Sequence, residues 1–130
     1  MKNNKFLFIT SVFFFCSFFS VVAQEQSKHK FVLLPFYSMG VDSISLTTAE
    51  SILRTEISKI SSMEIISAKQ TKTVLSGEIC SESECALDAG KKMGADKVLL
   101  CRLSSLGEKV ITQYFLIDVK NENEILIDQI

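Results

Sequence analysis

The sequence predicts one α/β (α+β) domain, a mixed five-stranded sheet with about three helices, in the order β-α-β-α-α-β-β-β after a signal peptide. Three patterns carry this prediction. A continuous apolar run at residues 31–37 is typical of a strand buried on both faces. Three capping patterns between residues 47 and 84 indicate helices. Alternating apolar and polar residues at 110–119 indicate a half-buried strand after a turn. Helices interspersed with strands imply packing against a sheet.

The first 23 residues have the three-part layout of a secretory signal peptide. A basic start precedes an apolar run at residues 6–22, and small residues fit a cleavage between Ala23 and Gln24. We therefore expect a periplasmic or secreted protein with a flexible mature N-terminus at residues 24–30. The alternative is a membrane anchor formed by uncleaved residues 6–22, because that run approaches the roughly 18 residues that span a bilayer.

The composition of the mature chain suits one small domain. The leader holds two of the 14 basic residues and none of the 15 acidic ones, so 12 basic and 15 acidic residues remain, a net charge of −3. A mildly acidic chain without a basic cluster gives no electrostatic footprint for nucleic acid. We predict a single domain over residues 31–130. Because the chain stops in an apolar strand, either this strand is tied into the sheet or the domain is truncated at the C-terminus, and we favour truncation.

The first strand and first helix follow from local patterns. Pro35 has no N–H for a sheet ladder, so it should lie near the end of the strand at residues 31–37. Thr47 and Glu50 form a capping box that begins the first helix. Arg54 and the other charged residues of this helix are expected mostly on its outer face. The expected buried face consists of Ala49, Ile52, Leu53, Ile57 and Ile60.

A short strand at residues 63–66 is expected next, before a second helix that Ser67 and Gln70 cap and Gly77 ends. The third helix is expected over about residues 84–93.

Ser81 and Glu84 offer the third helix a capping box, and Gly94 a C-cap. Gly90 and Gly94 are spaced too far apart, with no preceding strand, for a phosphate-binding loop. Gly90 is instead expected to allow close packing of the helix.

Three strands complete the chain. They are expected at residues 97–103, 110–119 and 124–130, with turns at residues 107–108 and 121–123. In the middle strand of the three, one face should carry Ile111, Phe115, Ile117 and Val119, and the other Thr112, Tyr114 and Asp118.

Cys80 and Cys85 are the leading candidates for covalent chemistry. An oxidising compartment favours a structural disulfide, and closing a loop of about six residues should contribute about 2 kcal/mol. The alternative is a redox-active pair, because Cys85 lies near a helix N-terminus that could lower its thiol pKa. The spacing of four residues differs from the two of thioredoxin-like motifs, so we favour the structural disulfide. Cys101 is expected to be a buried thiol, with intermolecular pairing as the alternative.

No catalytic, cofactor-binding or metal site is predicted. His29 is the one histidine of the sequence, and it lies beside the expected flexible terminus, so a Ser/His/Asp or Cys/His site has no base. Zinc would need four ligands at paired spacings. The acidic residues near the cysteines are interpreted as a solvated loop and helix start; they are Glu78, Glu82, Glu84 and Asp88.

Several of these motifs together resemble a known family. They are the run VLLPF at residues 32–36, the helix with Arg54, and the segment that combines Cys80, Cys85-Ala86, Gly90 and Met93-Gly94-Ala95-Asp96. The pattern resembles the N-terminal-domain-like module shared by TolB-type proteins, the curli-secretion protein CsgG and the penicillin-binding-protein activator LpoB, over nearly all of the mature chain. Two positions depart from it, Cys101 and Asn123, where relatives tend to carry glycine.

The resemblance implies a docking or scaffolding module of the cell envelope rather than an enzyme. We therefore predict a non-enzymatic exported domain that acts through protein–protein interaction with one or more envelope proteins. No nucleic acid, cofactor or metal is expected, and membrane contact only through an uncleaved signal segment. The sequence does not locate the contact surface; an exposed sheet edge, such as that of the last strand, is one candidate. The alternative function is an envelope thiol-disulfide protein that uses Cys80 and Cys85.

Overall fold

The computed structural model describes residues 27–130, apart from the side chains of residues 126–129. The predicted signal peptide and its cleavage between Ala23 and Gln24 lie outside the described residues, as does the alternative anchor at residues 6–22. Within residues 27–130, no helix has the length and apolar character needed to span a membrane.

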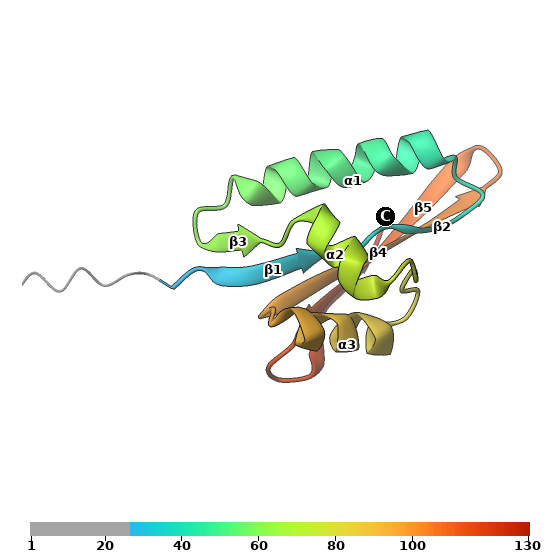
Figure 1. Ribbon diagram of the computed structural model, residues 1–130. Helices are drawn as coiled ribbons and strands as arrows, with labels where there is room; N and C mark the ends of the chain where they lie inside the picture. The colour runs from blue at the N-terminus through green and yellow to red at the C-terminus, as the bar shows by residue number, and fades with distance from the viewer. Residues whose placement is uncertain (1–26) are drawn as a thin grey trace, which may run out of the picture.

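The described chain forms one mixed sheet and three helices, which confirms the predicted fold class (Figure 1). The sheet has the order β3-β1-β4-β5-β6, with β2 also beside β4; β1 is parallel to β3 and β4, and β4, β5 and β6 are antiparallel neighbours. The elements are β1 (His29–Leu33), β2 (Tyr37–Met39), α1 (Ser43–Ser58), β3 (Met63–Ile65), α2 (Ala68–Leu75), α3 (Ser83–Met93), β4 (Lys97–Leu106), β5 (Lys109–Asp118) and β6 (Asn123–Gln129).

The sheet has six strands rather than the predicted five, because the strand expected at residues 31–37 is split in two. β1 pairs with β4 as far as Leu33 opposite Leu99, and β2 resumes with Tyr37 opposite Arg102. The segment from β1 to β2 therefore advances four residues, from Leu33 to Tyr37, while β4 advances three, from Leu99 to Arg102. Pro35 lies in the interruption, where its missing N–H leaves no ladder position unfilled.

The N-terminal end of β1 also differs from the prediction. The strand begins at His29, so the last two residues of the segment expected to be flexible, residues 24–30, pair with the sheet. His29 lies opposite Met63 of β3, and its imidazole Nδ1 is 3.8 Å from a carboxylate oxygen of Asp96. The side chain is nevertheless exposed, as expected.

Two apolar clusters lie on the two faces of the sheet. Successive residues of β1 alternate between them, because side chains of a strand point to opposite faces. On one face α2 and α3 cover Val32, and on the other α1 covers Leu33; both residues are fully buried (Figure 1). The C-terminal part of β1 is thus buried at the centre of the molecule, as the apolar run that begins at Phe31 predicts.

Helix α1 begins earlier than predicted. Its N-cap is Asp42, whose Oδ1 accepts a hydrogen bond of 2.8 Å from the Ser45 N–H. The proposed capping box at Thr47 and Glu50 is therefore wrong: Thr47 lies inside the helix, and its hydroxyl donates to the Ser43 carbonyl. Aspartate is among the strongest N-cap residues, because its carboxylate can accept a hydrogen bond from the backbone N–H three residues later, which here is that of Ser45.

The buried face of α1 is narrower than predicted. Ile57 is buried and Leu53 packs partly against the sheet. Ile52 and Ile60, however, are 58% and 43% exposed, which corrects their assignment to the core.

The caps of α2 and α3 follow the prediction in part. Ser67 accepts a hydrogen bond from the Gln70 N–H (3.2 Å), and Gly94 ends α3 in the left-handed conformation. The predicted box of Ser81 and Glu84 is wrong, because the N-cap of α3 is Glu82 and makes no side-chain cap hydrogen bond.

The close approach predicted at Gly90 is confirmed. A Cβ atom there would lie 2.5 Å from Cγ2 of Val98 and 2.8 Å from Cγ2 of Val119, so only glycine lets α3 reach the sheet.

The C-terminal hairpins largely follow the sequence. Gly107 turns β4 into β5 with a φ of 63°. Phe115 and Ile117 face the α2/α3 side and Tyr114 packs on the α1 side, so these three residues confirm the predicted two faces of the strand. In the next turn Glu122, not Asn123, adopts the positive φ.

Candidate interaction surface

A groove of about 340 Å³ lies at the carboxyl end of β1, between α1 and α2. We call it the α1–α2 groove. Helices on opposite faces of a sheet leave a crevice where a strand ends, and ligand sites of open α/β sheets lie at such ends. Its apolar lining includes Pro35, Phe36, Leu46, Leu75 and Ile79, and its ionisable lining residues are Glu50, Lys72 and Glu78.

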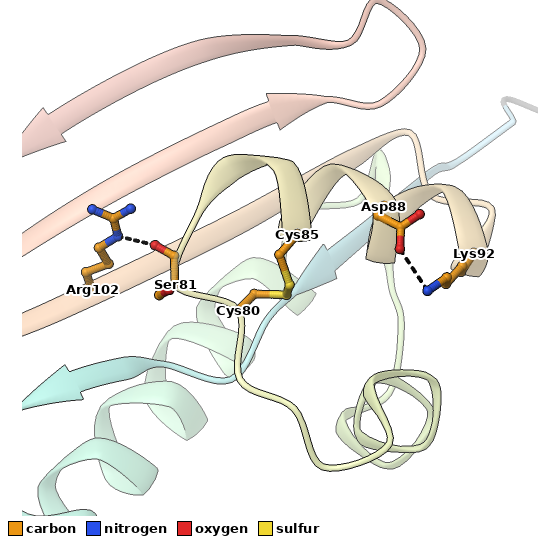
Figure 2. The surroundings of a disulfide bond; sticks show 6 residues. All are labelled: Cys80, Ser81, Cys85, Asp88, Lys92 and Arg102. Atoms are coloured by element: carbon orange, nitrogen blue, oxygen red, sulfur yellow. Dashed lines mark hydrogen bonds and ion pairs between the residues drawn. A yellow bond between two sulfur atoms is a disulfide. The ribbon is translucent and has the colours of Figure 1, made fainter.

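One wall of this groove belongs to the loop that holds the first cysteine. We call residues 77–82 the disulfide loop. Cys80 is bonded to Cys85 in the first turn of α3, with 5.5 Å between their Cα atoms (Figure 2). Cys80 is buried in the α2/α3-side cluster, whereas Ile79 beside it is 59% exposed and lines the groove. The bond therefore fixes the loop that presents Ile79.

Arg102 of β4 fastens the same loop from the sheet side (Figure 2). Its Nε donates to the Ser81 carbonyl, and its Nη2 lies 2.9 Å from Oε2 of Glu82. The guanidinium also lies 4.7 Å from the ring centre of Phe115, within the range of a cation–π contact. Arg102 thus holds the residues just before α3 against the sheet, although as a donor it leaves the first N–H groups of the helix uncapped.

Arg54 lies under the groove rather than on the outer face of α1, which corrects the prediction. Its Nη1 donates to the Ile66 carbonyl (2.8 Å) and its Nη2 to the Leu33 carbonyl (3.0 Å). The same Nη2 lies 3.3 Å from Oε1 of Glu50, which lines the groove. The long arginine stem lets the charged head reach inward from a position that a helical pattern assigns to the surface. The signal in the sequence was the inclusion of Arg54 in the family motif.

The other candidate residues are not brought together. Cys101 is fully buried on the α1 face, where burial raises the pKa of its thiol to about 12, with Glu50 adding to the effect. His29 lies at the opposite end of β1 from the groove. In the part of the chain that the structure describes, no three His, Cys, Asp or Glu side chains form a group that could hold a metal ion.

Two of the acidic residues near the disulfide have basic partners. Glu82 pairs with Arg102, and Asp88 lies 2.7 Å from Lys92 one helical turn on, where it raises the pKa of that lysine.

Comparison with known proteins identifies the fold. No protein-family model and no curated protein sequence matches the chain. The solved LpoB C-terminal domain from Salmonella enterica aligns with a TM-score of 0.67 at 15% identity, over 79% of this chain and 81% of that one. The chain has the LpoB fold. Lipoprotein GNA1162 from Neisseria meningitidis aligns with a TM-score of 0.60 at 14% identity, over 78% of each chain. TolB from Acinetobacter baumannii aligns with a TM-score of 0.54 at 13% identity, over 80% of this chain and 23% of that one. The expected likeness to LpoB and TolB is thus confirmed at the level of fold.

This LpoB-like fold carries a second groove, of about 320 Å³, between α1 and the sheet at β4 and β5. Ile52 and Leu53 line it from α1, and Leu103 and Tyr114 line it from the sheet. The groove explains why Ile52 is exposed: α1 stands off from this part of the sheet. Phe36 lines both grooves.

Proposed function

We propose that the protein is a non-enzymatic, exported cell-envelope domain that binds another protein through the α1–α2 groove. The observation that carries the proposal is an apolar groove whose wall is held by both a disulfide and Arg102. A preformed apolar groove with a few polar groups suits the insertion of an apolar side chain from a partner. The expected signal peptide and the likeness to a lipoprotein, GNA1162, support the envelope location.

The polar groups of the groove favour binding over catalysis. Glu50 is engaged by Arg54, and the hydroxyl of Thr47 donates to a backbone carbonyl. Lys72 and Glu78 complete the ionisable lining. The Thr47 hydroxyl and the Glu50 carboxylate already have partners within the protein, which does not favour their use as a nucleophile and its general base.

Thiol–disulfide exchange, the alternative function, is disfavoured by burial. Exchange would have to start at the partly buried Cys85 and would release a thiolate at Cys80, which is 1% exposed. Burial raises the pKa of a thiol and makes it a poorer leaving group. Catalysed reduction of insulin by the purified protein would support the alternative instead.

A pair of substitutions tests the groove. Ile79→Glu places a charge in the groove wall, and the matched control Ile44→Glu places one on α1 at a 78% exposed position outside both grooves. Each tagged protein is used to capture partners from envelope extract, with quantification by mass spectrometry. We expect a partner retained by the wild type and by Ile44→Glu to be depleted about tenfold or more by Ile79→Glu, because losing a buried aliphatic contact costs about 1.5–3 kcal/mol.

Equal capture by all three proteins would contradict the proposal. Matched thermal unfolding curves of the three proteins ensure that a loss reflects the surface and not the fold.

A further inference from the structure

The sheet has one long open edge, and it belongs to β6. β6 is last in the order β3-β1-β4-β5-β6 and pairs with β5 on one side. Within residues 27–130 no strand pairs with its other side. The opposite edge strand, β3, has only three residues and packs beside α1. Unpaired edges are templates for pairing with another chain.

The hydrogen-bond register identifies which backbone groups of β6 point outward. Thr112 and Ile130 exchange both of their hydrogen bonds, each 2.9 Å. In an antiparallel ladder such pairs alternate with pairs that exchange none. Ile127 and Gln129 therefore direct their N–H and C=O groups away from β5. These donors and acceptors match those of an added strand.

The usual protections of an edge are largely missing here. Native edges carry proline, lysine or bulges, or are short. β6 contains no proline, lysine or arginine. A bulge interrupts the pairing with β5 between Leu116 and Ile117, next to Ile125, and leaves the later residues in regular register. Ile125 and Ile130 lie on either side of residues 126–129, the regular part of β6, and are 50% and 78% exposed.

The charge of β6 indicates the chemistry of its partner. The strand contains Glu124 and Asp128 and no basic residue. Opposite charges across neighbouring strands stabilise a sheet and like charges destabilise it, so a second β6 is a poor partner. We propose that the β6 edge binds an extended segment of a partner protein in which basic and apolar residues alternate, as an added antiparallel strand. This site is independent of the α1–α2 groove.

Two matched peptides test strand addition. The probe is an acetylated, amidated heptapeptide in which lysine and valine alternate, and the control has the same sequence with alternate backbone nitrogens methylated. The control keeps the charge and loses the hydrogen bonds. We expect the probe to bind at least tenfold more tightly by fluorescence anisotropy and to slow amide exchange of Ile127 and Gln129. Equal binding of the two peptides, or unchanged exchange at both amides, would overturn the proposal.

Two variants locate the site. Ile127→Pro removes an outward N–H but no ladder bond to β5, a position where an edge strand tolerates proline. We expect a tenfold or greater loss of probe binding. The double variant Glu124→Lys with Asp128→Lys needs no backbone change and should favour a heptapeptide of alternating glutamate and valine. If both variants bind the lysine probe like the wild type, or if the wild type sediments as a dimer that Ile127→Pro abolishes, the proposed partner is wrong.

Discussion

Arg54 shows how a single side chain completes the ends of two parallel strands. The carbonyls of Leu33 and Ile66 lie where β1 and β3 end, and Arg54 donates to both. A buried carbonyl without a donor costs about 1–3 kcal/mol. A charged guanidinium in such a place needs a counter-ion, and Glu50 one helical turn earlier supplies it. Arg54 thus links α1 to the strand ends beneath the α1–α2 groove.

At the residue scale, Cys101 should not react with thiol reagents in the folded protein. It is fully buried, and burial raises its pKa to about 12 from a usual value of 9.0. For the chain from Gln24 onward, we expect no thiol to react with Ellman's reagent at pH 8 before unfolding and one to react in guanidinium. Three reactive thiols in the unfolded, unreduced protein would contradict the disulfide.

The same burial gives a pH dependence with a defined sign. Above about pH 9 the unfolded state ionises its thiol while the folded state keeps the proton, so the free energy of unfolding should fall as the pH rises towards 12. Urea titrations of the wild type and of Cys101→Ala between pH 8 and pH 10 measure it. A stability difference between the two proteins that does not change with pH would show that ionisation of Cys101 does not cause the fall.

At the scale of elements, the sequence predicts structure best where residues close together in the chain determine it. Ser67 and Gly94 cap α2 and α3 by bonds to residues three or four positions away, so the sequence around them suffices. The N-cap at Asp42 has a weaker signal in the sequence, because serine, isoleucine and threonine, which have modest helix propensity, make up much of the start of α1.

Features that depend on long-range neighbours could not be predicted from the sequence. Arg102 anchors the start of α3 from 20 and 21 positions away, and β2 exists because the chain resumes its place beside β4 after Pro35. The groove needs α1 and α2 to meet at the end of β1. No local pattern encodes which strands and helices become neighbours.

The packing of α3 against the sheet predicts the effect of a single methyl group. Gly90→Ala would place its Cβ 2.5 Å and 2.8 Å from methyl carbons of Val98 and Val119. Overpacking typically costs about 1–3 kcal/mol of stability, whereas replacing glycine by alanine in a helix gains about 1 kcal/mol. At such short distances we expect a cost in the upper part of the range, which outweighs the gain. We expect a net loss of stability in urea unfolding.

The matched control is Lys91→Ala on the same helix, whose partly exposed side chain should change stability by about 0.5 kcal/mol or less. A gain in stability for Gly90→Ala would show that α3 can move away from the sheet.

At the scale of the whole molecule, the disulfide should raise the stability of the entire domain. It closes a loop between α2 and α3, both of which cover the same face of the sheet. The chain-entropy model gives about 2 kcal/mol, which corresponds to roughly 8–16 °C in Tm for a domain of about 100 residues. We expect the double variant Cys80→Ala with Cys85→Ala to melt lower by this amount.

Reductant provides the control. It should lower the Tm of the wild type towards that of the double variant and leave the double variant unchanged. A wild-type Tm that is insensitive to reductant, with the bond shown to be broken by mass spectrometry, would contradict a stabilising role.

The central place of β1 has a consequence for the order in which the protein is synthesised. β1 is among the first folded segments to leave the ribosome, yet Phe31 pairs with Lys97, 66 residues later. At about 5–20 residues per second, β1 waits roughly 3–13 s for β4. For the first part of that interval β1 has no neighbouring strand, and β3 is the first strand made that can pair with it. The apolar end of β1, buried in the finished domain, is therefore left with at most β3 beside it until β4 has been made.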